Sequence, residues 1–206
     1  MKLKKKPKII IAIVVILLIA ALAVVLVLNF KPEKTPVKEV KVLKSIDEYG
    51  YQLKDNKTKK YKELFKDLED ILRADTVDEE AYAKKIAEMF VYDFFSLEDK
   101  AAKTDVGGVE FVHPSAVANF LLNAEDTYYK YLESNIYGER KQELPAVDTI
   151  TIESSEKSEF AWNNEMHEAY EIKLSWTYTK EKFSDYQKTA TVILIKSNLN
   201  YYVVQI

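Results

Sequence analysis

Residues 167–179 read HEAYEIKLSWTYT, and from Tyr170 onward apolar and polar side chains alternate. Neighbouring residues of a β-strand point to opposite faces, so this period of two predicts a strand with one apolar face. That face carries Tyr170, Ile172, Leu174, Trp176 and Tyr178. The segments 147–154, 186–196 and 200–206 follow the same period and are joined by polar connections, which predicts an antiparallel sheet of four consecutive strands.

Upstream of this sheet, the apolar spacing changes from two residues to three and four, which is typical of amphipathic helices. We expect helices at 58–74, at 76–97, where the first residues have the capping-box form, and at 114–136, which begins with a proline. A glycine pair within 105–112 leads into a short alternating segment that predicts one more strand. The sequence therefore predicts an α+β domain at 58–206. Three helices are expected to pack on a curved antiparallel sheet, in the order helix, helix, strand, helix and four strands.

The N-terminal residues 9–28 are all Ile, Val, Leu or Ala. A helix of this length spans the hydrocarbon core of a bilayer, which is about 30 Å thick. Lysines crowd the short segment before it. The positive-inside rule then predicts a single-pass protein of the cell membrane, with a cytoplasmic tail at 1–8, a transmembrane helix at 9–30 and an extracellular remainder. Two prolines and alternating charge predict an extended spacer at 31–57. Signal-peptide cleavage after Ala23 is the alternative, although it would leave an apolar new end.

The composition excludes several classes of site. The chain has no cysteine and two histidines, which excludes a disulfide framework, a thiol nucleophile and a Cys-ligated metal centre. Residues 58–206 contain 18 basic and 28 acidic residues, the opposite balance to that of a nucleic-acid-binding domain. We therefore expect no nucleic-acid partner, and a domain of this charge is repelled by anionic lipid surfaces.

The order of the predicted elements resembles the cone-shaped fold of the superfamily of nuclear transport factor two. With the basic tail, the membrane helix and the proline-containing spacer added, the whole layout resembles the bitopic scaffold component of type IV secretion and conjugation systems. It is also similar to other membrane-anchored bacterial proteins of this architecture. The resemblance implies a pocket between helices and sheet, and a domain that serves as an assembly platform outside the membrane.

The candidate pocket residues are those that such a fold would direct inward: Asp93, Tyr128, Tyr170, Trp176 and Tyr178. A catalytic pocket needs an acid–base pair, for which Asp93 with a tyrosine is the candidate; the alternative is that Asp93 is a hydrogen-bonded structural residue or simply exposed. His113, which precedes Pro114, is expected to shape the start of a helix, and His167 lacks further ligands at metal-site spacing. We therefore assign no catalytic residue, no metal and no cofactor.

Fourteen tyrosines supply side chains that suit protein contacts, although exposed tyrosine is also ordinary strand chemistry. We expect a membrane-anchored extracytoplasmic interaction or scaffold protein of the bacterial envelope. It would be held in the lipid bilayer through 9–30 and assemble with itself or with other envelope proteins. The alternative hypothesis is a pocket that binds a small ligand. Catalysis is a third hypothesis, which needs Asp93 or His113 at the wall of an open cavity.

Overall fold

The computed structural model describes residues 40–206, which share one hydrophobic core. The tail expected at 1–8, the membrane helix expected at 9–30 and the first part of the expected spacer, 31–39, lie outside the described residues. Within 40–206, none of the helices combines the length and the apolar character that a membrane span requires.

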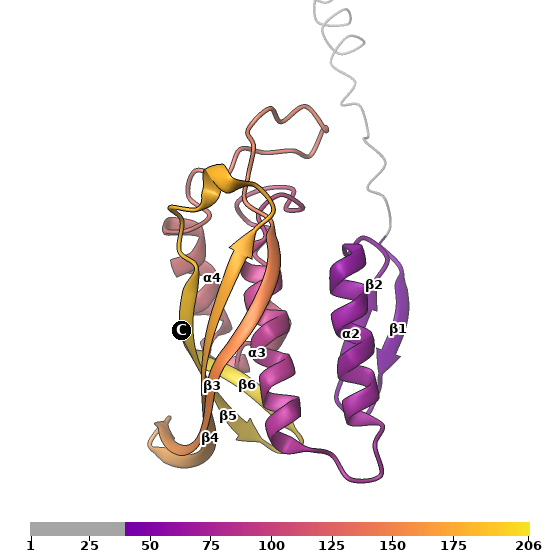
Figure 1. Cartoon of the computed structure of the whole chain (residues 1–206), viewed down its shortest axis with the longest axis vertical. Helices are drawn as coiled ribbons and strands as arrows, with labels where there is room; N and C mark the ends of the chain where they lie inside the picture. Colours follow the sequence, from indigo (N-terminus) through magenta and orange to yellow (C-terminus); the bar gives the residue numbers. More distant parts are fainter. Residues whose placement is uncertain (1–39) are drawn as a thin grey trace, which may run out of the picture. The chain divides into compact units, whose positions relative to one another are not determined.

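The main sheet contains four antiparallel strands in sequence order, as the alternating pattern predicted (Figure 1). They are β3 (Val147–Trp162), β4 (Glu165–Tyr178), β5 (Thr189–Ser197) and β6 (Asn200–Gln205). β3 is longer than the predicted 147–154, because its polar second half continues to pair with β4. Asn163 and Asn164 close this hairpin with φ angles of 52° and 67°, the left-handed conformation that a two-residue turn needs.

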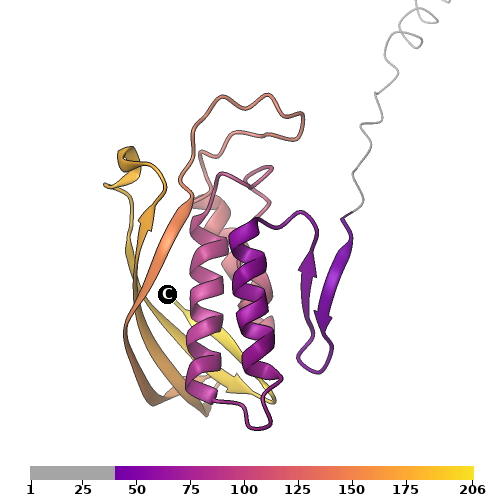
Figure 2. The same cartoon turned by 45° about the vertical axis from the view of Figure 1, so that its right-hand side comes forward.

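One face of this sheet is buried, and it is the face that the sequence predicted. On this face the buried side chains alternate along β4 and continue on β5; they are Tyr170, Ile172, Leu174, Trp176, Val192 and Leu194. Ala169 and Ile195, which are paired with each other, are buried as well. Tyr178, the last of the predicted series, is partly buried against the same core. The three helices supply the other side of this core (Figure 2).

The helices are α2 (Lys59–Leu72), α3 (Glu79–Phe95) and α4 (Val117–Asp126). α3 contacts all four strands of the sheet, and α2 packs on α3. α2 begins as predicted, because the Thr58 side chain accepts a hydrogen bond from the backbone N–H of Tyr61 (3.1 Å). The corresponding cap of α3 is Asp78, which accepts from the N–H of Ala81 (3.0 Å), and not Thr76.

The segment predicted as a strand at 105–112 has a different structure. It contains a 3-10 turn, η1 (Val109–Phe111), and a single parallel bridge between Val112 and Val203. The glycine pair explains the difference, because Gly107 lies directly against the backbone of α3 and Gly108 turns the chain with a φ of 73°. The chain therefore reverses here before a strand can form.

The helix predicted at 114–136 is shorter than expected. It consists of a 3-10 turn, η2 (Pro114–Ala116), followed by the ten residues of α4. The helix ends at Asp126, because Thr127 has the non-helical angles φ −118° and ψ −92°; its hydroxyl donates to the backbone oxygen of Asn123 (2.6 Å), which the end of the helix leaves free. The Tyr129 ring then enters the core, where its hydroxyl donates to the backbone oxygen of Phe94 (2.6 Å).

Part of the segment predicted as a spacer, 31–57, belongs to the folded unit. It forms a hairpin of β1 (Val42–Ile46) and β2 (Tyr51–Lys54), which lies beside α2 in both views (Figures 1 and 2). Ile46, Tyr51 and Leu53 are buried, and the Tyr51 hydroxyl is hydrogen-bonded to that of Tyr82 (2.7 Å). The hairpin therefore shares the hydrophobic core of the domain that was predicted at 58–206.

Candidate functional site

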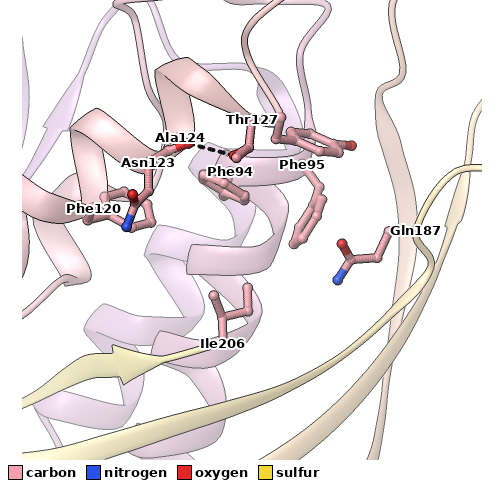
Figure 3. Close-up of a pocket in the computed structure, with 9 residues that line it drawn as sticks. Phe94, Phe95, Phe120, Asn123, Ala124, Thr127, Gln187 and Ile206 are labelled. Atoms are coloured by element: carbon pink, nitrogen blue, oxygen red, sulfur yellow. Dashed lines mark hydrogen bonds between the residues drawn. The ribbon is translucent and has the colours of Figure 1, made fainter.

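The described residues enclose a cavity with a volume of about 640 Å³. It lies where the end of α3, the helix α4 and the segment before β5 meet (Figure 3). Phe94, Phe95 and Phe120 line one side, and Gln187 faces them from the other. The remaining lining residues are Asn123, Ala124, Thr127, Tyr128 and Ile206. A volume of this size is typical of sites for small ligands.

The aromatic side of the cavity is held by ring contacts. Phe94 and Phe95, successive residues at the end of α3, lie edge to face with ring centroids 4.9 Å apart and an interplanar angle of 89°. Phe120 of α4 packs on Phe94 at 5.3 Å. The ring centroids of Phe95 and of Trp176 in β4 are 4.4 Å apart. These contacts fix the rings in place before any ligand enters.

The polar side of the cavity is built from uncharged groups. The Tyr178 hydroxyl donates to the backbone oxygen of Gln187 (2.6 Å), and the hydroxyls of Tyr128 and Tyr178 are 3.3 Å apart. Burial raises the pKa of both tyrosines, so both hydroxyls stay protonated at neutral pH. None of the lining residues is Asp, Glu, His, Lys or Arg.

A second cavity of about 340 Å³ adjoins the first and shares Phe120, Asn123 and Ile206 with it. It lies between β6 and the side of α4 that carries Asn119. Its walls also lack charged side chains within the described residues. The first cavity lies at the C-terminal half of α4 and the second at its N-terminal half, and they meet at Phe120 and Asn123.

The structure brings three of the five candidate pocket residues together. Tyr128 lines the cavity, Tyr178 is hydrogen-bonded to Tyr128, and Trp176 lies directly behind Phe95. Tyr170 lies apart from the cavity, where its ring packs on Tyr201 at 5.5 Å.

Asp93 does not line the cavity either, and lies instead in a buried network of charges. Its carboxylate accepts from Lys100 Nζ (3.0 Å), from Lys57 Nζ (2.7 Å) and from the backbone N–H of Gly108 (2.8 Å). Burial by itself would raise the pKa of Asp93, but Lys100 and Lys57 lower it to about 2. Lys100 also donates to Asp99 (2.7 Å). Every charge here has a partner, which is the arrangement of a structural ion network.

The two histidines do not line the cavity. His113 caps the turn η2, because its Nδ1 accepts from the backbone N–H of Ser115 (3.3 Å), and this is the role that its place before Pro114 predicted. Its ring lies edge-on to Trp162 and Tyr202. Within residues 40–206, no three His, Asp or Glu side chains are placed to hold a metal ion together.

Sequence reasoning missed most of the cavity wall. The apolar end of α3 indicated that Phe94 and Phe95 are buried, but it did not indicate a cavity beside them. Asn123, Thr127 and Gln187 come from a helix surface, a turn and a connecting segment, where single polar residues carry no pattern. Comparison of the chain with protein-family models, with curated proteins and with solved structures gave no match. Function is therefore inferred from the site itself.

Proposed function

We propose that this chain is a binding protein anchored in a bacterial membrane through residues 9–30, with the domain at 40–206 outside the cytoplasm and the cavity beside α4 as its binding site. The apolar run after a lysine-rich tail supports the anchor and its orientation. The order of helices and strands supports assigning the domain to the superfamily of nuclear transport factor two. The cavity itself carries the proposal about binding.

The decisive observation is that this cavity has fixed aromatic walls and no acidic or basic side chain. Acid–base catalysis needs a group that exchanges a proton near neutral pH, within reach of the substrate. The most strongly ion-paired carboxylate near this end of α3, Asp93, is bonded to two lysines and lies outside the cavity wall. The geometry therefore favours binding of a ligand over its chemical conversion.

Asn123→Trp is expected to weaken binding of a neutral aromatic probe, 2-naphthol, by about tenfold or more, because the indole ring occupies part of the cavity. Asn123 is exposed, so the change should leave the free energy of unfolding nearly unaltered. Probe titration of the full chain in detergent, with a protein-free blank, measures the affinity. Leu122→Trp is the control, because Leu122 is adjacent, 61% exposed and outside the cavity wall. Equal affinity in both variants and the unaltered chain would contradict the proposal.

A second candidate function, an interaction platform, is supported by the long connection between α4 and β3, 127–146. Connections of this length without helix or strand are often functional. Arg140 holds this one in place by donating to the backbone oxygens of Lys100 (2.8 Å) and Glu98 (2.7 Å). The pinned segment presents Tyr131 and Tyr137, which are 79% and 74% exposed, as a rigid contact surface for another protein.

Replacing Tyr131, Ile136 and Tyr137 together by serine is expected to reduce the assembly of the detergent-extracted full chain to a single copy. The physical reason is that these side chains supply the apolar contact area of the pinned segment. Light scattering after size-exclusion chromatography measures the mass. A control variant with Leu122, Met166 and Leu199 replaced by serine removes exposed apolar side chains elsewhere and should keep the assembly. A chain that is monomeric and has no co-extracted envelope partner would count against this function.

A further inference from the structure

We infer that the free edge of β3, residues 155–161, pairs with an extended peptide of another protein that carries two basic side chains three residues apart. Residues 155–161 line neither cavity, and they lie outside the connection 127–146. This edge is therefore a separate surface, and the inference does not depend on what the cavity binds.

β3 is the first strand of the sheet and has a neighbouring strand on one side only. The order of the strands is β3, β4, β5 and β6, and β3 pairs with β4. The other outer strand, β6, is partly covered, because the N–H of His113 donates to the backbone oxygen of Val203 (3.0 Å). Among the described residues, no backbone group bonds to the outer edge of β3 at 155–161. An unpaired edge of this kind can accept a further strand.

The two-residue turn at 163–164 determines which backbone groups of β3 are free. It makes Trp162 and Glu165 opposite neighbours that exchange both backbone hydrogen bonds. The direction of the N–H and C=O groups alternates along a strand, so those of Phe160 and Ser158 also face β4. The groups that face away from β4 are those of Ser155, Lys157, Glu159 and Ala161.

This edge is regular and accessible. The register shifts of β3 lie before Ser154, and residues 154–162 pair with β4 without a bulge. Residues 156–159 are exposed, and Lys157 keeps 55% of its side-chain surface. β5 pairs only with Ala169–Ser175 of β4, so the last part of the hairpin has no third strand beside it. An extended peptide can therefore approach the free groups of β3.

The charge beside the edge favours a basic partner. Residues 154–172 contain five glutamates and one lysine. Glu156 lies directly opposite Glu171, and Glu159 lies directly opposite Glu168, and such pairs of like charge repel each other. The two glutamates on β4 each have a lysine nitrogen at 3.6 Å. Glu156 and Glu159, next to the free edge, have no ion-pair partner among the described residues.

The positions of Glu156 and Glu159 give the spacing of the basic residues. Residues directly opposite each other on neighbouring strands have Cβ atoms about 5 Å apart, close enough for an ion pair. The peptide residues opposite the two glutamates are also three apart, whichever way the peptide runs. A second copy of this chain would bring the same excess of glutamate to the edge, so the charge favours a different protein.

The test measures peptide binding to the full chain in an uncharged detergent. The probe is the heptapeptide TVKVTKT with blocked ends and a neutral fluorophore; its lysines are three residues apart and its other residues favour strands. Fluorescence anisotropy measures the affinity, and the charge-reversed peptide TVEVTET is the control. We expect TVKVTKT to bind about tenfold or more tightly than TVEVTET, and its binding to weaken as salt is added.

Methylation of the peptide backbone separates strand pairing from general attraction between charges. When the lysines lie opposite Glu156 and Glu159, the N–H groups of the third and fifth peptide residues face β3 in either direction of pairing. Those of the second and fourth residues face away. We therefore expect N-methylation at the third and fifth residues to weaken binding about tenfold or more relative to N-methylation at the second and fourth. The two peptides have the same charge and the same number of methyl groups.

Substitutions at Glu159 test the same edge from the side of the protein. Glu159→Gln removes the charge and should weaken binding of TVKVTKT about threefold, as expected for an exposed ion pair. Glu159→Pro also removes the outward N–H, which has no partner in the hairpin, and should weaken binding about tenfold further. Asp70→Asn changes an exposed charge on α2 and should leave the affinity unaltered. Urea unfolding checks that each variant folds, and the methylated peptides test the unaltered chain if Glu159→Pro does not.

Each contrary outcome overturns a stated part of the inference. Equal affinity of the two methylated peptides would show that charge alone attracts the peptide and that β3 accepts no strand. Equal affinity of TVKVTKT and TVEVTET, or no binding of either, would show that the partner is not a basic peptide. If no peptide binds and Glu159→Pro lowers the mass of the assembled chain, a second copy occupies the edge and the inference is wrong. Binding of 2-naphthol is measured separately, so the proposed function of the cavity stands or fails independently of these results.

Discussion

Asp93→Ala is expected to lower the free energy of unfolding by about 3–5 kcal/mol, the range observed when one partner of a buried ion pair is removed. The side chains of Asp93 and Lys100 are each 4% exposed, so the substitution leaves the Lys100 ammonium group buried with Asp99 as its remaining acidic partner. It also removes the acceptor of the Gly108 N–H. Urea-induced unfolding followed by circular dichroism measures the loss.

The control for this prediction is Asp70→Ala on the exposed side of α2, which should change the free energy of unfolding by less than about 0.5 kcal/mol. The two substitutions remove the same charge, so they separate the network from the net charge of the domain. A loss of under about 1 kcal/mol for Asp93→Ala would show that the network contributes little.

The same network makes the free energy of unfolding depend on pH in the acidic range. The pKa of Asp93 is lower in the folded protein, about 2, than its ordinary value of 3.8. A lowered pKa means that the carboxylate stabilises the fold above its ordinary pKa and that this contribution disappears as the pH falls toward 2. The difference corresponds to about 2 kcal/mol. As the pH falls toward 2, the free energy of unfolding of an Asp93→Asn variant should therefore decrease by about 2 kcal/mol less than that of the unaltered chain.

Gly107→Ala is expected to lower the free energy of unfolding by about 3 kcal/mol. The new methyl group would meet backbone atoms of α3, which cannot move aside as the end of a side chain can. A Cβ at this position would overlap the backbone oxygen of Asp93 and lie 2.5 Å from its carbonyl carbon. The turn before η1 would have to move away from α3. This movement would also strain the hydrogen bond from the Gly108 N–H to the Asp93 carboxylate. Thermal and urea unfolding measure the effect.

Gly50→Ala is the matched control for Gly107→Ala. Gly50 has a φ of 75°, and no atom lies within 4 Å of the place that the methyl group of an alanine would take, so alanine there meets only the backbone strain of about 1–2 kcal/mol. If the two variants unfold at the same urea concentration, the close approach of Gly107 to α3 is not what fixes this turn.

The local periodicity of the sequence determined the class of the fold. The alternation in β4 fixed which side chains of that strand are buried, because a period of two leaves one choice of inward face once the apolar residues are given. The three- and four-residue spacing likewise located α2 and α3, and Thr58 marked the first residue before α2. The hairpin of β1 and β2 escaped prediction because its strands have five and four residues, too few for a period to stand out from a charged segment.

The candidate site was less predictable than the fold. The sequence named Tyr128, Trp176 and Tyr178, which the structure places at or next to the cavity, since aromatic residues with an inward direction are visible in a pattern. It also named Asp93 and Tyr170, which lie elsewhere in the core. The side of a helix or strand on which a residue lies can be derived from the sequence. Its place within the core depends on which helices and strands pack together.

The sequence by itself thus determined the α+β class, the antiparallel sheet, its buried face and the start of α2, because each depends on neighbours within a few residues. Only the tertiary structure decided that Gly107 lies against α3, that Lys57 and Lys100 meet on Asp93, and that Gln187 faces the phenylalanines across a cavity. These features join different helices, strands and connecting segments of the domain. Their formation depends on the packing of whole elements, which no local pattern of residues records.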